Sequence, residues 1–162
     1  MTMRVLLKPS LLLLLSMPWS MARAQSGAEG NPDPVKWSIA AKDMGSGKWA
    51  LEFNAAIAHG WSIYSQNNYG DMGPWPTSIA VDPAGGVQAA GKASEDGAKV
   101  IEGMDAVFGM EVKKFKESAT FTQFITAADA ERPVTGYFEY MTCNDEMCLP
   151  PTTVYFILGL AS

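Results

Sequence analysis

The chain is a series of short β-patterned runs separated by clusters of turn-forming residues, and this spacing restricts it to a β-rich fold. Residues 35–41 and 48–57 read as the first two strands. Turn chemistry recurs at residues 43–47, 67–68, 70–76, 83–86, 95–97 and 131–133. The chain holds 15 glycines and 10 prolines and shows no long 3.6-residue periodicity. Short strands at this spacing predict an all-β antiparallel sandwich.

The clearest strands lie near the C-terminus. Residues 134–141 and 153–158 are both rich in aromatic and β-branched side chains, and a short segment with two cysteines joins them. Residues 113–126 can be read as a helix, but residues 120–126 are richer in strand formers. We therefore predict a strand there as well.

Three regions are expected along the chain. Residues 1–24 carry Arg4 and Lys8, a short apolar run and small residues at Ala22 and Ala24, which predicts a secretory signal peptide. Its apolar run is shorter than the ~20 residues that span a bilayer. Residues 25–34 are small, polar and proline-rich, as in a flexible leader. Residues 35–162 are then a single domain. We expect a soluble exported protein, periplasmic if the source is Gram-negative.

The charge of the exported part excludes some partners. Without residues 1–24 the 12 basic residues fall by three to 9, against 17 acidic ones, a net of −8. Nucleic acids and anionic membranes both require a basic face. Neither is expected to bind here.

The two cysteines, Cys143 and Cys148, are the only ones in the chain, and four residues separate them. If the flanking runs pair antiparallel, facing Cα atoms lie roughly 4.5 to 5.5 Å apart. A disulfide requires roughly 4.4 to 6.8 Å. The bond is therefore available, although so short a loop gains less than the ~3 kcal/mol of a 15-residue loop.

Residue types alone leave three interpretations of this pair. Exported proteins use disulfides structurally more often than reactively. A redox pair requires one exposed, partly ionised thiol beside a resolving thiol. A third possibility is a monovalent copper site, because soft ligands gather in this segment. These ligands are Met141, Cys143, Met147 and Cys148, with no histidine nearby.

Three segments in order resemble the N-terminal periplasmic domain of the transmembrane thiol:disulfide interchange protein DsbD family. The most specific is residues 134–153, a strand, Cys143, a short acidic loop, Cys148-Leu-Pro-Pro151 and a returning strand. The others are Gly60-Trp-Ser-Ile-Tyr64 and Asp105-Ala-Val-Phe-Gly109 followed by Glu111-Val-Lys. The resemblance covers roughly residues 35–160.

The resemblance implies an immunoglobulin-like β-sandwich whose cysteine pair shuttles electrons. A membrane electron donor reduces the pair, and the pair reduces thioredoxin-fold partners, such as a disulfide isomerase or a cytochrome c maturation protein. Cys148 would be the attacking thiol and Cys143 the resolving one. Neither a cofactor nor a metal is implied for this exchange.

The resemblance also assigns supporting residues. Asp105 matches an acid near the thiols, where a carboxylate raises a cysteine pKa; the alternative is a solvated loop acid. Phe108, or Val107 in a gapless match, would cap the disulfide. Tyr64 and Trp61 would line the site, with the sandwich core as the alternative for both and the favoured one for Trp61. The loop that meets a partner comprises Asn144, Asp145 and Glu146. The only histidine, His59, is expected to be solvated.

The chain departs from the family in three respects. Four residues separate the cysteines where founding members have five, and Ala106 stands where the family has a second acid. The sequence also ends after the expected sandwich, without membrane helices or a thioredoxin-like domain. We expect such a domain to take electrons from another protein. The alternative is an exported binding module with a structural disulfide.

Overall fold

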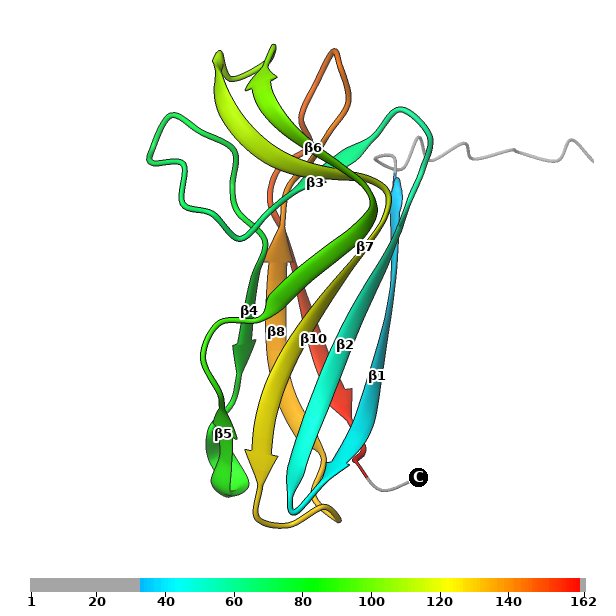
Figure 1. Cartoon of the computed structure of the whole chain (residues 1–162), viewed down its shortest axis with the longest axis vertical. Coiled ribbons are helices and arrows are strands. Elements are labelled where there is room, and N and C mark those ends of the chain that lie inside the picture. Colours follow the sequence, from blue (N-terminus) through cyan, green and yellow to red (C-terminus); the bar gives the residue numbers. More distant parts are fainter. Residues whose placement is uncertain (1–32, 161–162) are drawn as a thin grey trace, which may run out of the picture. The chain divides into compact units, whose positions relative to one another are not determined.

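The computed structural model describes residues 33–160, which form two antiparallel sheets packed face to face (Figure 1). The smaller sheet has the order β10-β8-β4. Its strands are β4 (Ser78–Val81), β8 (Val134–Tyr140) and β10 (Thr152–Leu158). The strands of the larger sheet are β1 (Val35–Gly45), β2 (Lys48–Ile57), β3 (Ser62–Tyr64), β5 (Val87–Ala89), β6 (Ser94–Asp105), β7 (Met110–Ala127) and β9 (Thr142–Cys143). The predicted all-β antiparallel sandwich is confirmed.

The core lies between the sheets because alternate side chains of each strand point inward. Phe53 of β2 meets Phe138 of β8 and Phe156 of β10, with ring centroids 5.5 and 5.2 Å apart. Trp37 of β1 packs on Phe138 at 4.7 Å. Aromatic pairs at these separations add about 0.5–1.5 kcal/mol each beyond the area they bury.

Most predicted strands are present. Strand β2 has the predicted bounds, and β7 contains the whole of residues 113–126, so the choice of strand over helix there is confirmed. The turn predicted at residues 95–97 is wrong, because these residues lie within β6, next to a bulge between Gly97 and Lys99. A Cβ atom at Gly97 would lie 2.7 Å from the Phe115 ring and 2.7 Å from the Ser118 carbonyl oxygen. The glycine permits close packing of strands rather than a turn.

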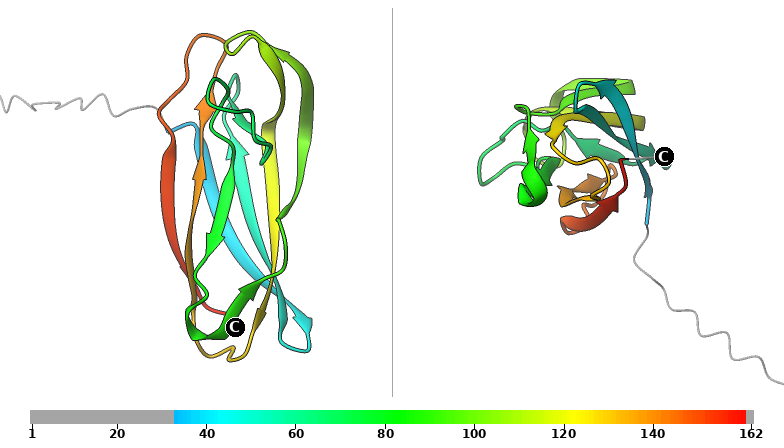
Figure 2. Two further views of the ribbon diagram at one scale, coloured as in Figure 1. Left: turned by 90° about the vertical axis from the view of Figure 1, so that its left-hand side faces the viewer. Right: turned by 90° about the horizontal axis from the view of Figure 1, so that it is seen from below.

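The cysteine segment crosses from one sheet to the other. Strands β8 and β10 pair antiparallel over seven residue pairs, as predicted for the two flanking runs. Between them, however, β9 joins the larger sheet, where Cys143 faces Ser62 and Thr142 faces Ile63 of β3. The buried Thr142 hydroxyl donates a hydrogen bond to the Ser62 carbonyl oxygen at 3.0 Å. Figures 1 and 2 show the cysteine loop and the tip of the β6–β7 hairpin at the same end of the sandwich.

The expected signal peptide, and residues 25–32 of the expected leader, lie outside the described residues. Within residues 33–160, no helix has the length and apolar character needed to cross a membrane.

Candidate redox site around the disulfide

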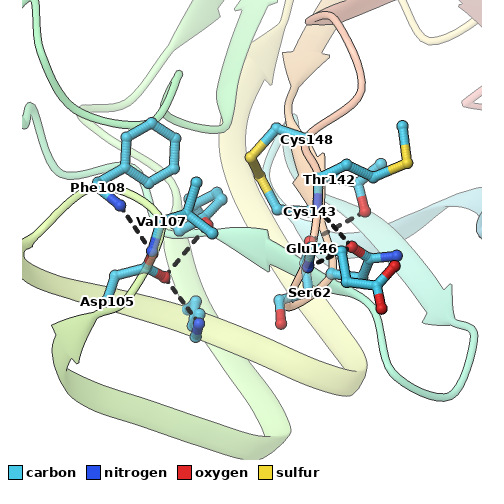
Figure 3. Close-up of a disulfide and its surroundings, with 12 residues drawn as sticks. Ser62, Asp105, Val107, Phe108, Thr142, Cys143, Glu146 and Cys148 are labelled. Carbon is cyan, nitrogen blue, oxygen red and sulfur yellow. Dashed lines mark hydrogen bonds and ion pairs between the residues drawn. A yellow bond between two sulfur atoms is a disulfide. The ribbon is translucent and has the colours of Figure 1, made fainter.

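Cys143 and Cys148 form a disulfide at the base of their loop (Figure 3). The two residues face each other as an isolated antiparallel bridge, and their Cα atoms are 4.0 Å apart, slightly closer than facing residues in a regular ladder. Cys143 is 2 % exposed, whereas Cys148 is partly exposed. Cys148 is therefore the more accessible residue of the pair.

The loop between the cysteines is a tight turn organised by one side chain. The Asn144 side-chain oxygen accepts hydrogen bonds from the Glu146 and Met147 N–H groups at 2.9 and 2.7 Å. The Asn144 N–H donates to the Met147 carbonyl oxygen at 2.9 Å. Asp145, Glu146 and Met147 are exposed, and Asn144 is half-buried. Asn144 thus shapes the loop, and the next three residues form its solvent-facing surface.

A small apolar cluster, separate from the main core, surrounds the disulfide. Tyr64, Val112 and Cys143 are its buried members, and Phe108 and Cys148 are among the partly buried residues that pack against them. The Phe108 ring meets the Tyr64 ring edge-on, with centroids 5.8 Å apart. The partly buried residues that complete the cluster are Tyr69, Met110 and Met141.

The residues predicted to cap or line the site lie in different parts of the structure. Phe108 belongs to the disulfide cluster, whereas Val107 is 45 % exposed and lies outside it. Tyr64 is 1 % exposed and packs in the disulfide cluster, whereas Trp61 packs against the main core. Of the two positions that the resemblance allowed for the cap, the structure places Phe108 against the tyrosine of the site.

Asp105 lies at the end of β6 and holds the β6–β7 loop (Figure 3). One carboxylate oxygen accepts hydrogen bonds from the Val107 and Phe108 N–H groups, at 2.9 and 3.2 Å. The other accepts hydrogen bonds from the Tyr64 hydroxyl at 3.3 Å and the Lys114 ammonium at 2.7 Å. Asp105 is 2 % exposed, so the alternative of a solvated loop acid is wrong.

The partners of Asp105 determine the protonation of this group. Burial alone would raise the pKa of the Asp105 carboxyl, but the Lys114 hydrogen bond and the two loop N–H groups outweigh burial and lower the pKa below its ordinary value. Burial and the charge of Asp105 raise the pKa of the Tyr64 hydroxyl well above its ordinary value. At neutral pH the carboxylate is therefore ionised, and the tyrosine keeps the proton that it donates.

Lys114 is the site residue that sequence reasoning missed. It lies on β7, directly opposite Tyr64 of β3. The neighbouring Lys113 pairs instead with Glu95, at 3.0 Å. Alternation along a strand sends neighbouring side chains to opposite faces. Only the register of β7 against β3 tells which of the two lysines faces the site.

The copper interpretation gains no support from the oxidised pair. A copper site of this kind needs thiolate ligands, and both sulfur atoms are joined in the disulfide. Met147 is 48 % exposed on the loop. His59 is exposed, as expected, and within residues 33–160 no three His, Cys, Asp or Glu side chains gather where they could hold a metal ion.

Comparison with known families identifies the family of this fold. The family described as "Thiol:disulfide interchange protein DsbD, N-terminal" matches residues 33–159. The chain belongs to this family. The predicted immunoglobulin-like β-sandwich of the DsbD N-terminal domain is thereby confirmed, and the disulfide-bonded pair agrees with a role in thiol:disulfide interchange.

Two solved structures share the fold. The N-terminal domain of Neisseria meningitidis DsbD in the reduced form is 20 % identical, with a TM-score of 0.54, over 78 % of this chain and 85 % of that one. The N-terminal periplasmic domain of Proteus mirabilis ScsB is 17 % identical, with a TM-score of 0.59, over 90 % of this chain and 49 % of that one. The chain therefore spans about half of the ScsB domain. No match was found among the curated proteins.

Proposed function

We propose that this DsbD N-terminal-like domain is a thiol:disulfide interchange module that passes electrons through Cys143 and Cys148. The observation that carries the proposal is the asymmetry of the pair. Cys148 is partly exposed beside a solvent-facing loop, and Cys143 is buried directly behind it. Exchange requires one accessible sulfur and one neighbouring sulfur that can displace it.

The exchange proceeds in two substitutions. In the reduced domain the Cys148 thiolate attacks one sulfur of a partner disulfide, which forms a mixed disulfide and releases the other partner sulfur as a thiolate that takes up a proton. The Cys143 thiol then loses its proton and attacks Cys148 Sγ. The mixed disulfide breaks, the Cys143–Cys148 disulfide forms again, and the partner leaves as a dithiol. Two electrons have moved from the domain to its partner. The reverse sequence, with a dithiol as electron donor, reduces the Cys143–Cys148 disulfide again.

The partners that fit this chemistry are thioredoxin-fold proteins of the disulfide isomerase or cytochrome c maturation type, with a membrane electron donor. The family supplies the chemical class of partner. The exposure of Asp145, Glu146 and Met147 beside Cys148 supports a partner-binding surface there. Exchange of this kind belongs in the periplasm, the compartment named for the ScsB domain of the same fold.

Trapping of the mixed disulfide tests the proposal. We expect the Cys143→Ala variant to accumulate a reductant-sensitive adduct with an oxidised thioredoxin-fold isomerase, because no resolving thiol remains. Cys148→Ala is the matched control and should form little adduct, since Cys143 is buried. Equal adducts from both variants, or none from either, would contradict the assignment of Cys148 as the attacking residue.

One alternative function also has an observation in its favour. The disulfide closes the segment that links the two sheets, as a purely structural crosslink in a binding module would. Structural disulfides have reduction potentials below about −300 mV, whereas the potentials of exchange proteins lie at about −120 to −270 mV. Equilibration of the protein with glutathione measures this potential and separates the two functions.

A further inference from the structure

The disulfide site contains a buried ion pair that the exchange chemistry does not require. The Lys114 ammonium lies 2.7 Å from the Asp105 carboxylate, and the two side chains are 17 % and 1 % exposed. Withdrawal of both charges from water costs several kcal/mol per ion, and their attraction restores this only when the geometry is good. A net gain in stability therefore does not explain why the pair is present, and its location beside the disulfide cluster suggests another role.

A single tyrosine side chain connects the ion pair to the cysteines. Tyr64 donates its hydroxyl hydrogen bond to Asp105, and its ring packs in the cluster that contains Cys143 and Cys148. Lys114 faces Tyr64 across β3 and β7 and is the only charged donor to the Asp105 carboxylate. The other donors, the two loop N–H groups and the tyrosine hydroxyl, carry no charge.

We propose that Lys114 is a positioning residue for thiol exchange, which neutralises the buried Asp105 carboxylate so that no uncompensated negative charge opposes the thiolate at Cys148. The inference rests on the proposed function. A thiolate and a carboxylate repel each other, and the repulsion is strongest where water is excluded. With Lys114 in place, the ion pair has no net charge. Because Ala106 follows Asp105, one lysine is enough to balance the acid of this loop.

The remaining ionisable groups near the pair have a smaller effect on the thiolate at Cys148. Asp145 and Glu146 lie on the exposed loop, where solvent and salt screen their charges. Tyr64 and Tyr69 are the ionisable side chains from the β3 side, and burial and the charge of Asp105 raise the pKa of Tyr64, so it stays neutral. Lys113 pairs with Glu95 instead. Among the described residues, Asp105 and Lys114 are thus the buried charged groups of the site, and their charges cancel.

Alkylation of Cys148 in the reduced full-length chain measures the effect. Iodoacetamide reacts with the thiolate, so its rate against pH reports the thiol pKa, and peptide masses assign the reaction to Cys148. In Lys114→Met we expect this pKa to rise by about one unit, which slows alkylation at pH 7 by about tenfold. In Lys114→Arg, which keeps the charge, the wild-type value is expected.

Two further variants separate charge from folding. Lys113→Met removes the same charge from the adjacent residue of the same strand, and we expect a change in rate of less than about twofold because the lysine pairs elsewhere. The double variant Asp105→Asn with Lys114→Met restores a neutral pair and should restore the wild-type pKa, whereas a merely structural defect would persist. The inference is overturned if Lys114→Met leaves the pKa unchanged or if the double variant fails to restore it. Alkylation needs no partner protein, so this result is independent of the trapping experiment.

Discussion

At the scale of single residues, the two cysteines of the site differ in exposure: Cys148 is partly exposed and Cys143 is buried. Cys143 is held in β9 against β3, while Cys148 follows the turn shaped by Asn144. The Phe108 ring packs beside them because the Asp105 carboxylate holds its N–H group. A neighbouring loop thus places one aromatic side chain in the cluster that contains the disulfide.

Removal of the Phe108 ring should expose the disulfide. In Phe108→Ala the edge-on contact with Tyr64 disappears, and a small dithiol reaches the sulfur atoms more easily. We expect reduction by dithiothreitol to become about fivefold faster, since access is one determinant of the exchange rate. Stopped-flow fluorescence measures it. Val107→Ala is the control, because Val107 lies outside the cluster and is 45 % exposed; equal rates in the two variants would show that Phe108 does not shield the bond.

At the scale of elements, the long strands β6 and β7 carry the loop that meets the cysteines. They pair from Ser94 with Thr122 to Asp105 with Met110, with one shift of register next to Gly97. Gly97 lets the Phe115 ring and the Ser118 carbonyl approach the strand closely. The β6–β7 pairing thus runs past Gly97 to the end of the hairpin at the site.

This part of the fold also shows what the sequence could and could not predict. Strand β2 and the β8–β10 pair were predictable, because alternating apolar residues stand between clear turn signals. The continuity of β6 was not, because Glu95 to Gly97 has the composition of a turn and the close approach of Phe115 depends on tertiary packing. The crossing after β8 was hidden for a similar reason, since β9 pairs with β3, 80 residues away.

The site was predictable to a similar degree. Spacing showed that a bond between the two cysteines was available, without deciding its role, and Asp105 and Phe108 followed from the family resemblance. Lys114 did not, because a pair of adjacent lysines gives no sign of which one faces inward. Residues whose role depends on the register between distant strands are those that a single sequence leaves undetermined.

An alanine at Gly97 tests the role of this glycine. The added Cβ atom would lie 2.7 Å from both the Phe115 ring and the Ser118 carbonyl oxygen, so β6 must shift. We expect the free energy of unfolding in urea to fall by about 2 kcal/mol, within the range for overpacked sites. Ser94→Ala, at an exposed position of the same strand, should change it by less than about 0.5 kcal/mol. A wild-type midpoint for Gly97→Ala would mean that the strand adapts without strain.

At the scale of the whole molecule, β7 joins the parts of the larger sheet, and its lysines pair with one buried and one partly buried acid. It forms hydrogen-bonded ladders with β2, β3, β5 and β6. Its adjacent lysines point to opposite faces, where Lys113 meets Glu95 at 3.0 Å and Lys114 meets Asp105 at 2.7 Å. Glu95 also accepts a hydrogen bond from the Gln66 N–H at 3.0 Å, which holds the segment after β3. Both acids therefore tie a loop to the central strand.

These two acids predict how stability depends on pH. Burial alone would raise both pKa values, but the hydrogen bonds and the lysines lower them below the ordinary values of 4.5 for Glu95 and 3.8 for Asp105. A carboxylate whose pKa is lower in the folded state stabilises the fold above its unfolded value, and this contribution is lost as the pH falls through the folded value. The free energy of unfolding should therefore decline as the pH drops below about 4.5, by up to about 1.4 kcal/mol per pH unit for each group.

Urea denaturation at a series of pH values from 7 to 2 checks this dependence, with Asp105→Asn as the decisive variant. The amide cannot titrate, so the variant lacks the contribution that the ionised, lysine-paired carboxylate makes at neutral pH. We expect Asp105→Asn to be less stable than the wild type at pH 7 and the two curves to converge toward pH 2, because protonation removes the same interaction from the wild type. Ser94→Ala changes no ionisable group and should run parallel to the wild type throughout. Parallel curves for Asp105→Asn would show instead that the carboxylate contributes by its shape and hydrogen bonds, and that its charge is not what holds the β6–β7 loop at the disulfide.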